Sequence, residues 1–81
     1  MTVPKRLASP RPASVQTGRD GLPERVGGVA VEAVLEDWLV EDRWWSDRPV
    51  RRRYVELVLD DGRCALVFRD LVSGRWLTQR G

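Results

Sequence analysis

The chain contains no histidine and only one cysteine, so several kinds of chemistry have little support in its sequence. Without histidine, the usual general base and the commonest metal ligand are both missing. Cys64 alone allows neither an intramolecular disulfide nor a zinc site built on paired thiolates, and such sparing use of cysteine fits a reducing compartment. We therefore expect a protein that is not an enzyme and that binds neither a metal nor a cofactor.

Long apolar runs are also missing. Lys5 and Arg6 lie near the amino terminus, but Ala, Ser, Pro and Arg follow them where a signal peptide would have its hydrophobic segment. No stretch approaches the roughly 20 apolar residues that a membrane-spanning helix needs. We expect a cytoplasmic protein with no membrane contact.

Charge is distributed unevenly along the chain. Residues 1–28 hold five cationic side chains against two carboxylates, whereas residues 29–81 hold nine arginines against ten carboxylates. The isoelectric point of about 9.3 therefore reflects the amino-terminal segment. Basicity of the whole chain does not indicate nucleic-acid binding, and only local clusters of arginine can support that function.

With 81 residues, the chain has room for one small domain. Residues 1–28 are rich in Pro, Ser, Arg and Gly, and their prolines break any helical or strand period. We interpret this segment as a disordered tail, which either is a passive extension or tethers the domain weakly to phosphate or to an acidic partner. Residues 29–81 then form the folded domain.

Residues 29–40 are ambiguous between strand and helix. Their apolar residues recur at helical spacing, but the valines and Trp38 suit a strand. No Ser, Thr, Asp or Asn precedes Val29 as a helix cap, and the neighbouring strands need a partner. A strand is therefore favoured, with a helix as the alternative.

Asp61-Gly62 is the clearest turn signal in the chain. This dipeptide accepts the positive φ angles of a two-residue type I′ hairpin turn. Pairing the flanking residues outward sets Leu57 opposite Leu66 and Val55 opposite Phe68. One face of the hairpin is then wholly apolar and predicts the core.

The same pairing places other side chains of the hairpin. Tyr54 falls opposite Arg69 on the face away from the core, which predicts a cation–π contact. Cys64 falls opposite Leu59 on the core face, where a thiol behaves as a small, inert hydrophobe.

A second turn is predicted over residues 46–49, where Pro49 fixes φ and the preceding Ser and Asp cap locally. If Trp45 pairs with Val50 across it, Trp38 falls opposite Leu57 on the core face. A last short strand over 75–79 completes a small antiparallel β-meander of three to four strands. The predicted core residues are Trp38, Val55, Leu57, Leu66, Phe68 and Trp76.

Arginines and aromatic residues cluster around the predicted second turn. In one interpretation, Arg51-Arg52-Arg53 makes cross-strand pairs and stacks that close the end of the sheet. In the other, guanidinium groups bind phosphate or an acidic partner while aromatic rings stack on a base or fill a pocket. Trp44 and Trp45 point to opposite faces of a strand, so one of them should be exposed. The candidate binding residues are Trp44, Trp45, Arg51, Arg52, Arg53, Tyr54, Arg69 and Arg75.

At these residues, the chain resembles small bacterial proteins and domains of unknown function that are associated with translesion polymerase genes. It is also similar to the carboxy-terminal segment of ImuB-like proteins, which are inactive relatives of the Y-family polymerases. That segment carries an acid where this chain has Arg53. The resemblance covers roughly residues 30–80, and its motifs are Val34-Leu35, Trp38, Trp44-Trp45, Pro49, Arg52-Arg53-Tyr54, Asp61-Gly62-Arg63, Phe68-Arg69-Asp70 and Gly74-Arg75-Trp76.

The resemblance implies a non-catalytic accessory module in DNA repair or translesion mutagenesis. Its implied partners are translesion polymerase or other mutasome proteins, single-stranded or duplex DNA, or both. Two other functions stay open: a stand-alone nucleic-acid-binding module, and a structural subunit whose tryptophans form a homo-oligomer interface.

Overall fold

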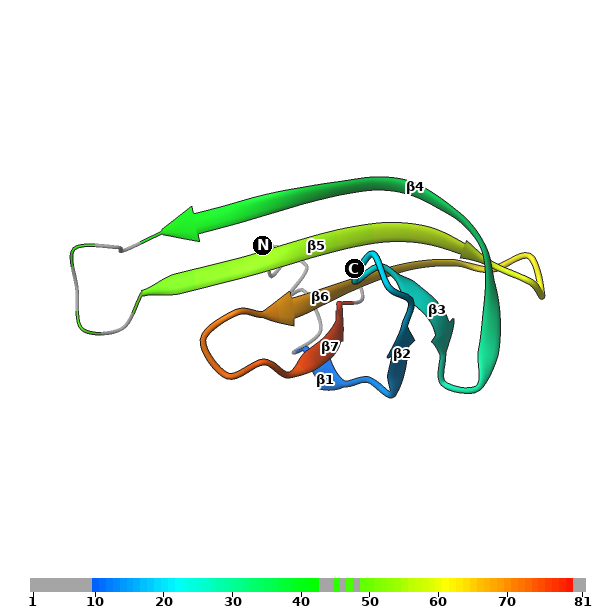
Figure 1. Ribbon diagram of the computed structural model, residues 1–81, viewed down its shortest axis with the longest axis horizontal. Coiled ribbons are helices and arrows are strands. Elements are labelled where there is room, and N and C mark those ends of the chain that lie inside the picture. Colours follow the sequence, from blue (N-terminus) through cyan, green and yellow to red (C-terminus); the bar gives the residue numbers. More distant parts are fainter. Residues whose placement is uncertain (1–9, 43–44, 46, 48, 80–81) are drawn as a thin grey trace, which may run out of the picture.

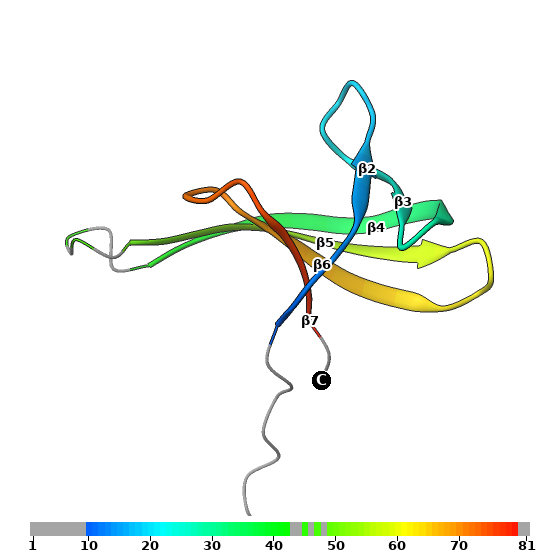
Figure 2. The same cartoon turned by 90° about the horizontal axis from the view of Figure 1, so that it is seen from below.

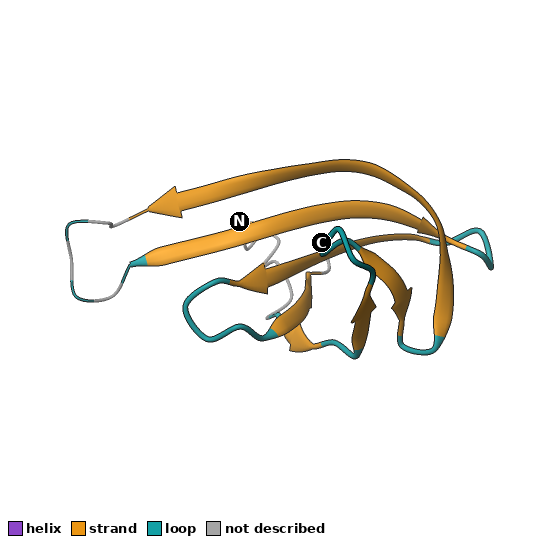
Figure 3. Cartoon of the chain, in the orientation of Figure 1, coloured by secondary structure: helices purple, strands orange, loops and turns teal. Residues whose placement is uncertain are grey.

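The protein is a single antiparallel sheet of seven strands. The computed structural model describes residues 10–42, 45, 47 and 49–79, and these contain no helix (Figure 3). The mainly β, antiparallel fold is confirmed, but the strands number seven rather than three to four. They are β1 (Arg11–Pro12), β2 (Val15–Thr17), β3 (Pro23–Val26), β4 (Val29–Asp42), β5 (Val50–Leu59), β6 (Cys64–Asp70) and β7 (Trp76–Gln79).

The two edge strands of the sheet, β1 and β2, belong to one continuous segment of the chain. The strand order is β1-β7-β6-β5-β4-β3-β2, so residues 11–17 pair with β7 through β1 and with β3 through β2. Between these strands, the N–H of Ala13 donates to the C=O of Trp76 over 3.0 Å, and the N–H of Gly27 donates to the C=O of Ser14 over 2.8 Å. The sheet therefore curls into a half-barrel (Figures 1 and 2).

The predicted disordered tail does not extend to residue 28. Residues 10–28 contain β1, β2 and β3, while residues 1–9 lie outside the described part of the chain. Pro12 lies in β1 at the end of the sheet, and Pro23 is buried as the first residue of β3. Both are places where a strand tolerates the missing amide of proline.

The β3–β4 hairpin closes on Gly27 and Gly28, whose φ angles are +57° and +82°. Val26 and Val29 pair directly across these glycines. Positive φ at both residues of a two-residue loop is what a type I′ turn requires. The sequence predicts this turn type at Asp61-Gly62 instead.

The β5–β6 hairpin closes on three residues, Asp60 to Gly62. The N–H of Gly62 donates to the C=O of Leu59 over 2.9 Å, and the N–H of Leu59 donates to the C=O of Arg63 over 2.7 Å. Gly62 has a φ of +88°. This is the pattern of a three-residue hairpin loop, in which a type I turn is followed by a glycine bulge. The predicted two-residue turn is wrong by one residue.

Asp61 supports this turn through its side chain. Its carboxylate accepts a hydrogen bond from the N–H of Arg63 over 3.1 Å and another from the guanidinium Nε over 2.8 Å. The first of these hydrogen bonds is the main reason why the pKa of Asp61 is lowered. The ionised carboxylate thus binds Arg63, the residue immediately before β6.

The extra loop residue changes which side chains of β6 share a face with β5. Val55 lies opposite Val67 rather than Phe68. Because side chains alternate along a strand, a shift of one residue moves every side chain of β6 to the other face. Leu66 and Phe68 therefore lie on the opposite side of the sheet from Val55 and Leu57, and their assignment to one shared core is wrong.

The core lies inside the half-barrel, on what we call the inner face of the sheet. Its buried cluster consists of Val55, Leu57, Leu59 and Val67, none more than 4% exposed. The core positions predicted for Val55 and Leu57 are confirmed. Partly buried side chains pack against the cluster, namely those of Leu22, Val26, Val29, Val31, Val34, Ala65 and Trp76.

Residues 29–40 lie in β4, which confirms the strand interpretation, but the register of this strand differs from the prediction. Trp38 lies opposite Tyr54 instead of Leu57, and β4 carries two register irregularities, at Glu32 and Leu35. The register is therefore displaced by an odd number of residues, which moves Trp38 to the outer face. Trp38 is 40% exposed, so its assignment to the core is wrong.

Leu57→Ala should lower the free energy of unfolding by about 2–5 kcal/mol, because it empties a fully buried position. Leu66→Ala should cost less, since Leu66 is only partly buried and lies on the outer face. Urea denaturation followed by circular dichroism measures both losses. Equal losses would contradict the register, and Leu57→Val against Leu66→Val repeats the comparison if an alanine variant does not fold.

Gly62→Ala should cost about 1–2 kcal/mol of stability, because an L-residue is strained at the φ of +88°. Crowding cannot cause this loss, since a Cβ at Gly62 would meet no atom within 4 Å. Gly62→Asn should cost less, because asparagine tolerates the left-handed region better than alanine. Thermal unfolding of the three proteins gives the order, and an alanine variant as stable as the parent would rule out the bulged turn.

Candidate functional site

Four side chains form a stack across the outer face of the sheet. Trp38, Tyr54 and Phe68 lie opposite one another on β4, β5 and β6. The rings of Trp38 and Tyr54 are stacked, with centroids 5.5 Å apart and planes within 7°, and the centroids of Tyr54 and Phe68 are 5.0 Å apart. The guanidinium of Arg52 lies 4.7 Å from the centroid of the Phe68 ring. We call these four residues the aromatic stack.

The aromatic stack buries Phe68 on the face opposite the core. Phe68 is only 1% exposed, and Arg52 is held over it by a hydrogen bond of 3.2 Å from Nη1 to the hydroxyl of Tyr54. The predicted cation–π contact therefore exists on this face, but Arg52 and Phe68 make it instead of Arg69 and Tyr54. Such a contact contributes about 0.5–1 kcal/mol where it is exposed.

The other two arginines of β5 form ion pairs with β4. Arg51 Nε lies 3.0 Å from Glu41 Oε2, and Arg53 Nη2 lies 2.7 Å from Asp37 Oδ2. Both pairs are exposed, so each contributes little stability. Each of the three guanidinium groups therefore has a partner within the chain. These contacts are those of the first interpretation of Arg51-Arg52-Arg53, in which cross-strand pairs and stacks close the end of the sheet.

Arg69 and Arg75 lie apart from the aromatic stack. Arg69 is opposite Arg53, and its Nε donates to the C=O of Gly74 over 3.3 Å. Because Arg52 and Arg53 are adjacent on a strand, Arg52 and Arg69 lie on opposite faces. The predicted position of Arg69 on the face away from the core is therefore wrong. Arg75 is exposed in the loop before β7.

The predicted tryptophan pair can be assessed at one position. Trp45 is 69% exposed, which confirms that one of the two adjacent tryptophans is exposed. Trp44 lies outside the described residues.

Two leucines on β4 belong to the exposed surface and were not predicted there. Leu35 and Leu39 are each 53% exposed, on either side of Trp38. The signal in the sequence is the run Trp38-Leu39-Val40, because three consecutive apolar residues on a strand cannot all face one core. β4 and β5 extend here beyond the other strands, at the left of Figure 1.

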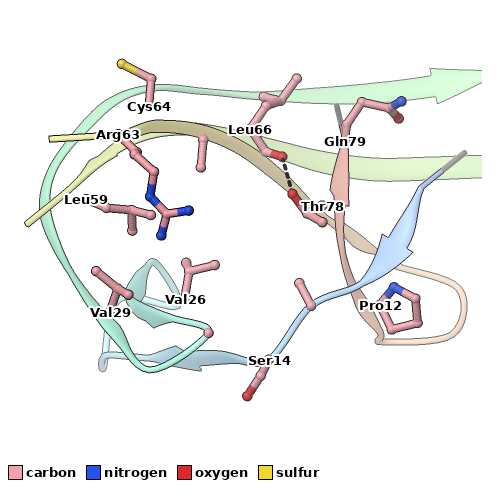
Figure 4. Close-up of a pocket in the computed structure, with 13 residues that line it drawn as sticks. Pro12, Ser14, Val26, Val29, Leu59, Arg63, Cys64, Leu66, Thr78 and Gln79 are labelled. Carbon is pink, nitrogen blue, oxygen red and sulfur yellow. Dashed lines mark hydrogen bonds between the residues drawn. The ribbon is translucent and has the colours of Figure 1, made fainter. Parts of the chain in front are cut away.

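The end of the half-barrel near the β5–β6 turn contains a cavity of about 820 Å³ (Figure 4). Val26, Val29 and Leu59 line it from the inner face, with Ser14 and Thr78 at its other side. Arg63 is the one charged side chain among its lining residues, and this guanidinium is paired with Asp61. The wall is therefore polar and apolar in about equal parts, with no group of convergent charges.

Cys64 is exposed, so its predicted inward position is wrong. It lies opposite Val58 because the β6 register is shifted by one residue. Among the residues that the structure describes, no three His, Cys, Asp or Glu side chains are grouped to hold a metal ion. These residues likewise form no helix that could span a membrane.

No protein-family model matches the chain, and neither a curated protein nor a solved structure was found to be similar to it. The resemblance to the ImuB-like segment therefore stays a prediction.

Arg52→Ala should lower the free energy of unfolding by about 1 kcal/mol, because it uncovers Phe68 and removes the hydrogen bond to Tyr54. Arg69→Ala is the matched control, and its effect should stay within about 0.5 kcal/mol, as for most surface changes. Urea denaturation measures both. If the two variants lose equal stability, the aromatic stack does not hold this face together.

Proposed function

We propose that the protein is a non-catalytic binding module that docks onto a protein partner through the exposed apolar side chains of β4. In keeping with the resemblance described above, the partner belongs to an error-prone DNA repair or translesion mutagenesis assembly. Catalysis forms no part of the proposal, because the chain has no histidine and none of its carboxylate residues is buried among the described residues.

The observation that carries the proposal is the exposure of Leu35, Trp38 and Leu39, between 40% and 53%, on one projecting strand. Trp38 and Leu39 lie on opposite faces of the strand, so a partner that covers the edge of the strand would contact both. Exposed apolar side chains grouped in this way mark interaction sites more often than isolated ones do. Tryptophan is also enriched among the residues that contribute most to protein binding. A partner that covers this strand would remove apolar surface from water without disturbing the core on the inner face.

Nucleic-acid binding is the second candidate. Arg53 is paired with Asp37 and lies directly opposite Arg69, so two arginine side chains are neighbours on the inner face. A phosphate could lie between them, but the remaining arginines of β5 are engaged with Glu41 and with the aromatic stack. Protein docking is therefore the stronger proposal.

An affinity pull-down from the source cell, with and without DNA damage, tests the proposal. The tagged full chain should retain a translesion polymerase or a protein bound to one. Leu39→Asp should lose most of that protein, because covering a carboxylate with an apolar surface of the partner carries a large desolvation cost. Val72→Asp is the matched control, since Val72 is 63% exposed in the β6–β7 loop, and it should retain the protein.

Circular dichroism of both variants confirms that the fold is intact. Retention of the same protein by Leu39→Asp would exclude β4 as the docking surface. Steeply salt-dependent binding of single-stranded DNA, lost in Arg69→Ala, would favour the second candidate. Stability that rises with protein concentration would instead indicate the homo-oligomeric subunit.

A further inference from the structure

Part of β4 is an open edge of the sheet. β3 pairs with β4 only at Val29 and Ala30. From Glu36 to Asp42, β4 pairs residue by residue with β5, and no other strand of the described chain lies on its far side. We call residues 36–42 the β4 edge. An antiparallel ladder uses the N–H and C=O groups of alternate residues, so those of the others point outward along the β4 edge.

We infer that the β4 edge binds an extended basic peptide of the partner, which adds to the sheet as a further strand. This inference rests on the proposed function and specifies the chemistry of the partner. Main-chain hydrogen bonds supply affinity in strand addition, and the side chains on either side of the edge supply specificity.

The charges of the β4 edge select the peptide. Two acids, Glu36 and Asp37, precede three apolar residues, and two more acids, Glu41 and Asp42, follow them. Asp37 and Glu41 each make an ion pair with an arginine of β5, but both pairs are exposed and therefore weak. Directly opposed side chains on neighbouring strands attract when their charges are opposite. The complementary peptide therefore has two basic residues, three apolar residues and two basic residues, and this symmetric pattern fits both strand directions.

Glu36 strengthens the preference for a basic partner. It lies directly opposite Glu56 on β5, and like charges in this position repel. Within the described residues, no ion pair relieves Glu36. A Lys or Arg of the added strand opposite Glu36 would offset that repulsion.

The apolar centre of the β4 edge fits the same occupant. Trp38 and Leu39 are adjacent, so they lie on opposite faces, and both are at least 40% exposed. Apolar side chains of an added strand would cover both. On the outer face, such a side chain would extend the cross-strand row formed by Trp38, Tyr54 and Phe68.

A second copy of the chain fits poorly. Antiparallel pairing of two β4 edges about Leu39 would set Glu36 opposite Asp42 and Asp37 opposite Glu41, each twice. Like charges directly opposite each other are destabilising, and parallel pairing in register also brings acids together. Glu36 and Glu56, which face each other and make no ion pair within the described residues, repel the phosphates of a nucleic acid. A basic peptide is the occupant that the charge pattern favours.

Titration calorimetry with the full chain and the peptide Lys-Lys-Val-Val-Val-Lys-Lys tests the inference. We expect saturable binding at one site. A peptide of the same composition, Val-Lys-Lys-Val-Lys-Lys-Val, should bind at least about five-fold more weakly, the factor that about 1 kcal/mol of mismatched pairing gives. Two further versions of the original peptide carry N-methyl groups on alternate amides, one version on each of the two alternating sets. The version that blocks the amides facing β4 should lose binding, and the other should retain it.

Variants of β4 locate the site. Glu36→Lys should weaken peptide binding about five-fold, since it replaces an attraction with a repulsion. Glu32→Lys makes the same charge change on the same strand, at a register irregularity outside the β4 edge. It should change the affinity less than two-fold, because a charge about 13 Å away along a strand lies beyond the screening length.

Three outcomes would overturn the inference. In the first, the two N-methylated peptides bind equally well. In the second, Glu36→Lys and Glu32→Lys change the affinity equally. In the third, the chain associates with itself and the peptide does not dissociate the copies. None of these results depends on the pull-down, so the proposed function can stand when the strand addition fails. Conversely, peptide binding with no retained polymerase would leave the β4 edge as a site and remove the proposed repair role.

Discussion

The three-residue loop from Asp60 to Gly62 determines which side chains face the inside of the half-barrel. It places Val67 beside Val55 in the core and sends Phe68 to the outer face. A loop of two residues would exchange these positions, because side chains alternate along β6. The core and the aromatic stack therefore depend on the same loop, although they lie on opposite faces of the sheet.

Sequence alone locates this turn but does not determine its length. Gly62 indicates a positive φ, and both the two-residue and the three-residue loop use one there. The hydrophobic pattern cannot decide between them, because Leu66, Val67 and Phe68 are consecutive apolar residues and either register buries some of them. The hydrogen bond from the N–H of Arg63 to Asp61 is a local feature of the longer loop that propensity does not reveal.

The amino-terminal strands were missed for a different reason. β1 and β2 hold two and three residues, too few to show a period, and Pro10 and Pro12 lie beside and within β1. Their stability comes from pairing with β7 and β3, which lie at opposite ends of the sheet order. Such strands form because the sheet curls far enough for one segment to reach both ends, and this curvature is a property of the assembled sheet.

The candidate site was predicted in composition but not in arrangement. Alternation along β5 separates Arg51 and Arg53, which pair with β4 on the inner face, from Arg52 on the outer face. Trp38 was assigned to the core, but a register displaced by three residues moves it to the outer face beside Tyr54. What sequence reasoning could not supply is therefore the register of β4, because its irregularities at Glu32 and Leu35 have no marker in the sequence.

The length of β4 determines where the proposed docking surface lies. β4 has 14 residues and its neighbour β3 has four. Most of the edge of β4 that faces away from β5 therefore extends past β3. A long apolar edge promotes aggregation unless charge or irregular backbone blocks it. In the proposed strand addition, the acids that flank Trp38-Leu39-Val40 oppose pairing between two copies and attract a basic strand. That proposal thus derives both protection against self-association and selection of a partner from one charge pattern.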